Sequence, residues 1–394
     1  MRVALLTREY PPDVYGGAGV HVEYLARELR NLVEVDVHAW GVDRAGAIGH
    51  EAWDALDGPA PELAALRAMS IDLTMAARTA DADLVHSHTW YANFGGHLAK
   101  LVHDIPHVVT VHSLEPLRPW KAEQLGGGYA LSSYCERTAV EAADAIVAVS
   151  QGMRGDLLDA YPAVDPDRVS TIYNGIDTDE YAPDPGTDVL ERHGIDPDVP
   201  AIVFVGRITR QKGVAHLLEA MRHVDADAQL VLCAGAPDTP EIGAEVARRV
   251  DELQAQRGNV LWLNEMLPKP EVIQILSHAT VFACPSIYEP LGIVNLEAMA
   301  CETAVVATAT GGIVEVVDAG VTGLLVPIEP GDDATGEPRD PAAFAAAFAE
   351  GLNAVLRDPA RAAEMGRAGR ARAVERFAWP AIAQETVALY QRLL

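Results

Sequence analysis

Short runs rich in β-branched residues alternate with longer helical patterns from one end of the chain to the other. This alternation is typical of βαβ units, which build parallel sheets covered by helices, so we predict an α/β fold. In the first half, strands are expected at 3–7, 34–40, 84–89, 107–112, 145–150 and 169–174. A second series follows, with strands expected at 201–207, 229–235, 259–264, 280–286, 304–309 and 323–327.

The second series of strands predicts a second sheet, and 394 residues suffice for two domains of ~100–200 residues each. Between the two series, residues 181–200 are rich in Pro, Asp and Gly, which is typical of a linker. We therefore predict Rossmann-like, doubly wound domains at 1–185 and 186–376. The last segment, 377–394, has apolar residues at helical spacing and is expected to pack on the body of the protein.

The charge balance limits the ligands that the chain can bind. Lys and Arg number 30 and Asp and Glu 57, a formal charge of −27, which disfavours nucleic acid and anionic membranes as partners. An anionic ligand must then be held by a few basic side chains, and the scarce lysines are candidates. The four cysteines are far apart and no apolar stretch approaches ~20 residues, so we expect no disulfide, no structural zinc and a cytoplasmic protein.

Polar residues that follow strands are the candidate site, because ligands of open parallel sheets bind beyond the carboxyl ends of the strands. Arg207 and Lys212 follow the first strand of the second series and can neutralise a leaving diphosphate. Glu289 and Glu297 flank a helix start near Ile293, whose free N–H groups suit a diphosphate while the carboxylates bind sugar hydroxyls. The alternatives are that Glu289 begins a turn and Glu297 is a surface residue of the helix. Arg207 and Lys212 would then be two exposed cations on a loop.

In the first half, the glycine-rich loop at Gly16 and Gly17 lacks the third small residue of a dinucleotide fingerprint. A dehydrogenase is therefore disfavoured, whereas a loop closing over phosphates fits. His86 and His88 share one face of a strand, but no third ligand stands at a telling spacing, so we predict no metal. His112 ends a strand and is a site candidate, with an ordinary strand-end histidine as the alternative.

Whether a residue follows or precedes a strand also decides the interpretation of two further groups of residues. Trp90 and Tyr91 follow a strand and suit stacking on sugar rings, although buried aromatics of the core are the usual alternative. Three D-x-D pairs resemble the metal-binding pairs of some glycosyltransferases, but they precede their strands, so we interpret them as solvated turns. They lie at 81–83, 165–167 and 225–227.

Several motifs together resemble the retaining GT-B glycosyltransferases that use nucleotide sugars. They are the glycine-rich loop, H-x-H-T-W, T-V-H-S-L-E-P, Y-N-G-I-D, V-G-R-x-x-x-x-K-G and E-x7-E. The resemblance implies two domains facing an interdomain cleft, the donor on the C-terminal domain, the acceptor on the N-terminal one, and a final helix that crosses back. Within this class the chain is most similar to short actinobacterial glycogen-synthase-type enzymes, which are associated with α-maltose-1-phosphate synthesis from ADP-glucose and glucose 1-phosphate.

The resemblance also implies roles for single residues. Arg207 and Lys212 would hold the donor diphosphate, Glu297 the donor ribose and Glu289 the transferred glucose, which His112 would contact near its 6-hydroxyl. Backbone N–H groups would contact phosphates at Gly16, Gly17, Leu291, Gly292 and Ile293. Bacterial glycogen synthases carry a lysine before the two glycines, whereas this chain has Val14 and Tyr15, which weakens a polymer-extending role.

We therefore expect a retaining glucosyltransferase, independent of metal and cofactor, that moves glucose from ADP-glucose to glucose 1-phosphate. Arg118 and Lys121, on the loop after His112, are assigned to the acceptor phosphate. The alternatives are a glycogen synthase that extends an α-1,4-glucan, a UDP- or GDP-sugar transferase with another small acceptor, and a nucleotide-sugar-binding regulatory protein without turnover. The oligomeric state stays open, with a homodimer among the options.

Overall fold

The computed structural model describes the chain except for residues 15, 61, 119–125, 226, 236 and 332–335. Its packing divides the chain into two compact units. The first comprises Met1–Gly175 and Trp379–Leu394, and the second comprises Ile176–Ala378. The division therefore lies at Gly175 and Ile176 rather than at 185 and 186, and the final segment belongs to the first unit from Trp379 rather than from 377.

The described part of the first unit contains a parallel sheet with the strand order β3-β2-β1-β4-β5-β6-β7. The strands are β1 (Arg2–Thr7), β2 (Glu34–Trp40), β3 (Ile48–His50), β4 (Leu84–His88), β5 (His107–Val111), β6 (Ala145–Ala148) and β7 (Val169–Thr171). Six of them match the predicted strands. The edge strand β3 was not predicted, because three residues with a central glycine give no hydrophobic pattern.

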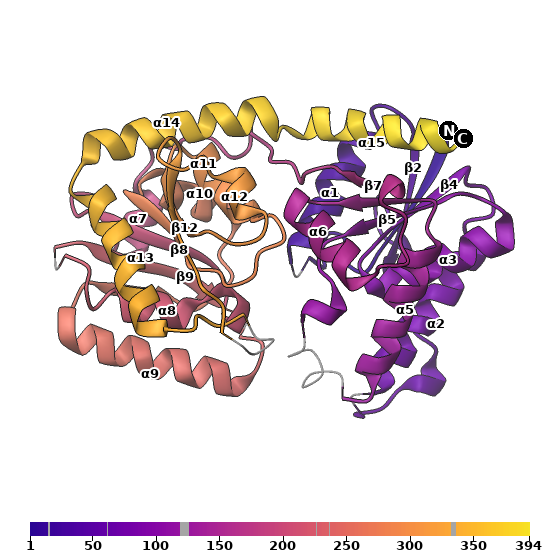
Figure 1. Cartoon of the computed structure of the whole chain (residues 1–394), viewed down its shortest axis with the longest axis horizontal. Coiled ribbons are helices and arrows are strands. Elements are labelled where there is room, and N and C mark those ends of the chain that lie inside the picture. The colour runs from indigo at the N-terminus through magenta and orange to yellow at the C-terminus, as the bar shows by residue number, and fades with distance from the viewer. Residues whose placement is uncertain (15, 61, 119–125, 226, 236, 332–335) are drawn as a thin grey trace. The chain divides into compact units, whose positions relative to one another are not determined.

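Helices cover both faces of this sheet (Figure 1). They are α1 (Gly17–Leu29), α2 (Leu63–Ala77), α3 (Trp90–His103), α5 (Gly128–Ala142), α6 (Gln151–Ala160) and α15 (Trp379–Leu393). Alternate residues of β1 point to opposite faces, as the pleat requires. Val3 and Leu5 join the core beneath α1 and α15, whereas Ala4 and Leu6 join the core beneath α2 and α3.

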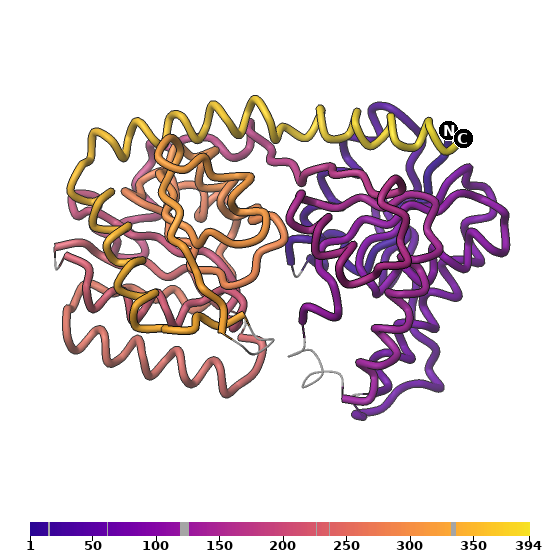
Figure 2. The backbone as a smooth tube through the Cα atoms, viewed as in Figure 1, coloured from indigo at the N-terminus to yellow at the C-terminus, as the bar shows by residue number. Residues whose placement is uncertain are grey.

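The final helix α15 packs on the first unit alongside α1, as the yellow end of the trace shows (Figure 2). Its buried side chains recur every three or four residues, which places them on one helical face. That face comprises Trp379, Ile382, Ala383, Thr386, Leu389 and Tyr390. The last sixteen residues, 379–394, are thus part of the first unit's core, although some two hundred residues of the second unit precede them in the chain.

The second unit has its own parallel sheet, whose described strands follow the order β10-β9-β8-β11-β12-β13. They are β8 (Ala201–Arg207), β9 (Gln229–Gly235), β10 (Val260–Leu263), β11 (Val281–Cys284), β12 (Ala304–Thr308) and β13 (Gly323–Val326). The helices are α7 (Asp188–His193), α8 (Val214–Ala220), α9 (Pro240–Arg257), α10 (Lys269–Ser277), α11 (Ile293–Ala300), α12 (Ile313–Val316), α13 (Pro341–Leu356) and α14 (Pro359–Arg376). All six predicted strands of this half are present.

The predicted linker at 181–200 is instead a packed part of the second unit. Tyr181 is buried, the backbone N–H of Asp184 donates to Ser277 Oγ at 3.0 Å, and α7 lies within the segment. The N–H of Val189 donates to the buried Gln274 Oε1 at 2.7 Å. Pro, Asp and Gly mark turns here, but these turns are fastened to α10 by long-range hydrogen bonds that composition does not reveal.

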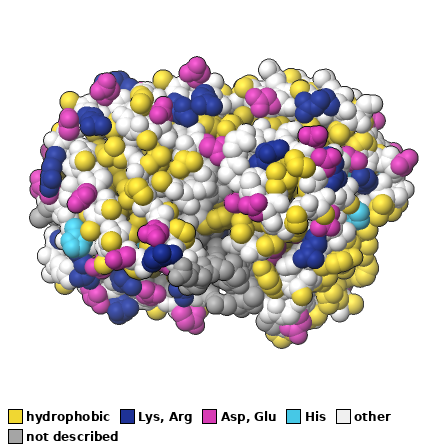
Figure 3. Space-filling model, in the orientation of Figure 1, with side chains coloured by type: hydrophobic (Ala, Val, Ile, Leu, Met, Phe, Trp, Pro, Cys, Tyr) yellow, Lys and Arg dark blue, Asp and Glu magenta, His cyan; other side chains and the backbone are white. Residues whose placement is uncertain are grey.

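The distribution of surface charges and the state of the cysteines agree with what the composition predicts. On the face drawn in Figure 3, basic and acidic side chains are interspersed and no continuous basic field is visible. All four cysteines are buried free thiols. Among the described helices, none combines the length and apolarity that crossing a membrane requires.

Candidate active site

An ion pair between Lys212 and Glu289 lies at the carboxyl edge of the second unit's sheet. Lys212 Nζ is 2.6 Å from Glu289 Oε2, and Ser286 Oγ donates to the same oxygen at 3.2 Å. Burial alone would lower the pKa of Lys212, but the Glu289 carboxylate outweighs it and the pKa lies above its ordinary value. The lysine is therefore a fixed, charged group at a largely buried position.

Three loops that follow neighbouring strands build this ion pair. Lys212 follows β8, Glu289 follows β11, and the loop after β12 contacts Glu289 through a hydrogen bond from the Gly312 N–H to the Glu289 carbonyl at 2.9 Å. The loops after β8 and β11 also touch directly, because the Ile287 N–H donates to the Gln211 carbonyl at 2.9 Å. Strand adjacency thus brings together residues that are 77 positions apart.

Gly213 holds the Lys212 loop against the loop after β11. Its φ is +64°, and a Cβ at this position would lie 2.1 Å from the carbonyl oxygen of Pro285. Gly194 has a similar φ of +69° with no atom within 4 Å of a Cβ. The two glycines share a backbone conformation and differ in the space around them.

We expect Gly194→Ala to cost about 1 kcal/mol of unfolding free energy through its left-handed backbone, and Gly213→Ala ~3 kcal/mol or more through the added clash. Denaturant unfolding of both variants measures the difference. Because relief of the clash displaces Lys212, turnover should fall in Gly213→Ala and not in Gly194→Ala. Equal stability and activity of the two variants would contradict the close approach at Pro285.

The amino end of α11 lies next to Glu289. Gly292 caps this helix with a φ of +96°, and no side chain occupies the cap position. The first N–H groups of α11 follow directly, at the backbone where Leu291, Gly292 and Ile293 were predicted to contact phosphates. A helix start beside a charged lysine suits an anionic group.

Arg207, the last residue of β8, is held by a carboxylate. Its Nη1 donates to Asp238 Oδ1 at 3.0 Å, and Asp238 follows β9, the neighbouring strand. Arg207 ends the strand that Lys212 follows, so the two cations lie at the same edge of the sheet. Asp238 was not predicted, because its pairing with Arg207 spans 31 positions of sequence.

Glu297, in the second turn of α11, accepts a hydrogen bond from the buried Tyr181. The distance from Tyr181 Oη to Glu297 Oε1 is 3.1 Å. Burial raises the pKa of Glu297, and the hydrogen bond from Tyr181 and the charge of Lys212 act against that rise. Glu297 is thus oriented by the segment that composition had marked as a linker.

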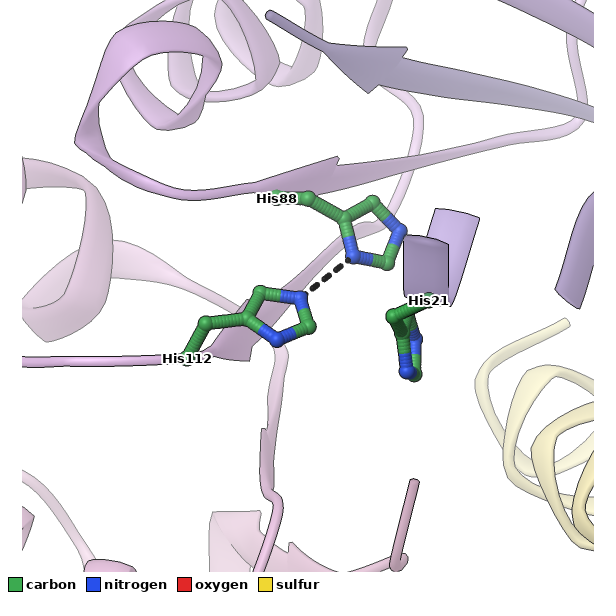
Figure 4. A group of neighbouring side chains, drawn as sticks. All are labelled: His21, His88 and His112. Atoms are coloured by element: carbon green, nitrogen blue, oxygen red, sulfur yellow. Dashed lines mark hydrogen bonds between the residues drawn. The ribbon is translucent and has the colours of Figure 1, made fainter. Parts of the chain in front are cut away.

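In the first unit, three histidines converge at the carboxyl edge of the sheet (Figure 4). They are His21 of α1, His88 at the end of β4 and His112 after β5, with His88 Nδ1 3.1 Å from His112 Nε2. One ring nitrogen from each histidine lies within 4.8 Å of those of the other two. Burial lowers the pKa of all three, to about 4 for His21, so the imidazoles are neutral at pH 7.

The histidine trio replaces the His86 and His88 pair that the sequence offered as metal ligands. His86 shares a strand face with His88, but its nitrogens are 2.6 Å from Tyr390 Oη and 2.7 Å from Thr110 Oγ1, so His86 is already satisfied. The described residues do supply a third histidine, His21, which sequence spacing did not reveal. Neutral imidazoles at this separation could hold a transition metal, or could meet hydroxyl groups of a sugar.

Structure separates the remaining predicted residues of the first unit. Trp90 is 4% exposed and packs in the core, so it presents no face to a sugar, whereas Tyr91 is half-buried. The Gly16 N–H already donates to Glu9 Oε2 at 2.7 Å, so a phosphate would have to displace that carboxylate. Arg118 is half-buried near Tyr91, and Lys121 lies outside the described residues.

A buried carboxyl network supports the loop that carries His112 and Arg118. Glu136 Oε1 accepts hydrogen bonds from Tyr161 Oη at 2.5 Å and from the Glu115 N–H at 2.9 Å. Glu115 Oε2 accepts from Ser132 Oγ at 2.7 Å. Burial, aided by the nearby Glu115 charge, raises the pKa of Glu136 to about 8.

This network predicts a pH-dependent stability. Folded Glu136 holds its proton up to about pH 8, whereas the unfolded chain releases it near the ordinary value of 4.5. The stabilisation is therefore complete below pH 4.5 and is lost as the pH rises through 8. We expect wild type to lose ~2 kcal/mol of unfolding free energy relative to Glu136→Gln between pH 6 and pH 8, measured by denaturant unfolding. Parallel pH profiles of the two proteins would contradict the raised pKa.

Five residues that the structure brings to these sites were not predicted as site residues. Three of them, Asp238, Tyr181 and His21, act through partners distant in sequence, whereas Ser286 acts through Glu289, three positions away. The fifth, Arg8, follows β1 directly, and the rule that ligands bind beyond strand ends would have found it.

Comparisons with known proteins agree with this architecture. The family described as Glycosyltransferase Family 4 matches residues 15–180, and the family described as Glycosyl transferases group 1 matches residues 187–372. The sucrose-phosphate synthase of Thermosynechococcus elongatus superimposes with a TM-score of 0.79 at 25% identity, covering 100% of this chain and 98% of that one. The predicted α/β class with two Rossmann-like GT-B sheets is confirmed.

Two relatives match over their whole length. The alpha-maltose-1-phosphate synthase of Mycolicibacterium smegmatis is 56% identical over 401 aligned positions, covering 100% of both chains. The enzyme of the same name from Mycobacterium tuberculosis is 54% identical over 400 positions with the same coverage. The predicted resemblance to this enzyme class is confirmed.

Proposed function

The chain belongs to the glycosyltransferase family that contains the alpha-maltose-1-phosphate synthases, and we propose that it moves glucose from ADP-glucose to glucose 1-phosphate with retention at the anomeric carbon. The observation that carries the proposal is the 56% identity over the full length of both chains. A nucleotide-sugar donor and a sugar acceptor follow from the family. The adenine nucleotide follows from the resemblance to the glycogen-synthase-type enzymes.

We assign the donor to the second unit. Lys212 and Arg207 would neutralise the diphosphate, and the amino end of α11 would receive its oxygens. Glu289 would then accept hydrogen bonds from hydroxyls of the transferred glucose, and Glu297 would accept them from the ribose. The fixed geometry of the Lys212–Glu289 pair supports this assignment, because groups held in place need not reorganise when charge develops.

We assign the acceptor to the first unit, with His112 as the contact of the transferred glucose. The hydrogen bond to His88 occupies Nε2 of His112, and no residue in the described part of the chain bonds to its Nδ1, which can therefore meet a ligand. Burial lowers the pKa of His112 and keeps the ring neutral. His112 can therefore form a hydrogen bond with a sugar hydroxyl without adding a charge.

The proposed reaction is a single displacement. The new bond forms on the same face of the sugar ring from which the old bond departs. The bond between the anomeric carbon and the diphosphate oxygen breaks, and its electron pair leaves with ADP. The 4-hydroxyl oxygen of glucose 1-phosphate forms the new bond, and its proton passes to the leaving phosphate oxygen. Lys212 and Arg207 stabilise the charge that builds on the diphosphate. Such electrostatic stabilisation by fixed groups is usually the largest contribution to lowering the barrier.

A donor and acceptor panel tests the proposal. Wild-type protein is incubated with ADP-, UDP- and GDP-glucose, each with glucose 1-phosphate or with a soluble α-glucan, and products are identified by mass spectrometry. We expect maltose 1-phosphate from ADP-glucose and glucose 1-phosphate at the highest kcat/KM. A glucan extended in preference to glucose 1-phosphate, or a higher kcat/KM with another donor, would overturn the assignment.

A further inference from the structure

An arginine that follows β1 lies where an acceptor would bind. The strands β2, β1, β4 and β5 are neighbours in the first sheet, so the residues at or just beyond their carboxyl ends lie near one another. These residues include Trp40, Arg8 and Tyr91, and Arg118 lies farther along the loop that follows β5. None of the donor assignments above uses any of them.

Arg8 is held by aromatic rings. Its Cζ lies 4.3 Å from the ring centre of Tyr91 and 5.3 Å from that of Trp40, and the two rings are 5.5 Å apart at 90°. Within the described ranges, no carboxylate forms an ion pair with Arg8. The guanidinium is thus placed by its contacts with the two rings and with the Tyr91 hydroxyl, and its remaining N–H groups can meet a ligand.

Arg118 is the second cation at this position. Its Nη1 donates to Ser113 Oγ at 3.1 Å, and its buried Nε has no hydrogen-bond partner among the described residues. Burial raises the pKa of Tyr91, and the charges of both Arg8 and Arg118 act against that rise, so both guanidinium groups lie near the Tyr91 hydroxyl. Glu115, which also acts on Tyr91, is fastened by Ser132.

Other arginines of this unit show what a structural arginine looks like. Arg44 donates to the carbonyl oxygens of Tyr10, Pro11 and Trp40, and Arg168 donates to those of Glu141 and Ala143. Their N–H groups are consumed by the fold. Arg8 makes no hydrogen bond to a backbone carbonyl among the described residues and interacts instead with the Tyr91 side chain, so most of its N–H groups are not consumed by the fold.

We propose that Arg8, Tyr91 and Arg118 bind the phosphate of the acceptor, a hexose 1-phosphate. This inference rests on the proposed function. It keeps Arg118, which the sequence assigned to this phosphate, and adds Arg8 and Tyr91. Two guanidinium groups and a phenolic hydroxyl offer several donors to one dianion, the chemistry by which arginines recognise phosphate. In a chain of net charge −27, such a local pair is needed to hold a phosphorylated sugar.

Steady-state kinetics of Arg8→Gln test the assignment. We expect the KM for glucose 1-phosphate to rise ~10-fold or more, with the KM for ADP-glucose changed less than about 2-fold. Inorganic phosphate should compete with glucose 1-phosphate in wild type and compete more weakly in the variant. Arg8→Lys, which keeps the charge but loses the several N–H donors of the guanidinium, should fall between the two.

Arg2 provides a matched control on the same strand. It is the first residue of β1, at the opposite sheet edge, where it pairs with Glu34 and Asp36. Arg2→Gln removes the same charge and should leave both KM values unchanged. Thermal unfolding of all variants separates loss of binding from loss of folding.

The outcomes separate this inference from the proposed function. If wild type makes maltose 1-phosphate but Arg8→Gln keeps the wild-type KM for glucose 1-phosphate, the phosphate assignment is overturned and the function stands. If Arg8→Gln raises the KM values of donor and acceptor equally, Arg8 is structural and the assignment is again overturned. If wild type makes no maltose 1-phosphate at all, the proposed function fails first.

Discussion

Replacing Lys212 by alanine should lower kcat by ~10²-fold or more and leave the protein folded. The substitution removes the cation nearest to Glu289, and with it the charge proposed to stabilise the departing diphosphate. It also leaves the Glu289 carboxylate, 7% exposed, without its ion-pair partner. Initial-rate kinetics with saturating donor and acceptor measure the effect, and calorimetric titration with ADP should show weaker binding.

Two further variants sharpen this prediction. Arg248→Ala removes an exposed cation from α9 and should keep wild-type kcat, since Arg248 pairs only weakly at the surface. In Lys212→Ala/Glu289→Gln, the combined loss should be smaller than the product of the single losses, because the two groups act as a pair. A Lys212→Ala enzyme with near-wild-type kcat would contradict the diphosphate assignment.

Replacing Trp379 by alanine should lower the unfolding free energy of the first unit by ~3–5 kcal/mol, the range for a fully buried aromatic. Trp379 is 1% exposed, its ring stacks on Tyr24 at 5.9 Å, and its centroid is 5.2 Å from that of His21. A Cβ on Gly175 would lie 2.5 Å from this indole, so the close packing of the ring requires a glycine at position 175.

Denaturant unfolding of Trp379→Ala measures the loss, with Trp53→Ala as the matched control. Trp53 is 51% exposed in the same unit, so its removal should cost less than ~1 kcal/mol. Because His21 loses a neighbour in Trp379→Ala, turnover should fall as well. Wild-type stability of Trp379→Ala would show that α15 does not belong to the first unit's core.

The strands could be predicted because a buried parallel strand is a nearly continuous apolar run. In β9, for example, QLVLCAG is buried throughout and stands out from the helical patterns beside it. The edge strand β3 has three residues and no such run. The segment 181–200 was misjudged because composition reports where the backbone turns, whereas Tyr181 and Val189 are fastened by partners far along the chain.

The candidate site was predictable wherever a side chain follows a strand. Lys212 and Glu289 satisfy that rule and meet at 2.6 Å. The scarcity of lysine was a weaker guide, since Lys100 and Lys269 also form ion pairs, with Asp144 and Glu180. Arg8 satisfies the rule too, but it was hidden among the many arginines, and only the structure shows its guanidinium resting on two aromatic rings.

Transfer of a labelled glucosyl group tests the central claim most directly. Wild-type protein is incubated with ADP-glucose that is uniformly 13C-labelled in the glucose and with unlabelled glucose 1-phosphate, and the product is analysed by NMR and mass spectrometry. The account predicts maltose 1-phosphate that carries the label only in its non-reducing glucose, with an α-linkage between the two sugars. Label released as free glucose, label in a growing glucan, or a β-linkage would contradict it.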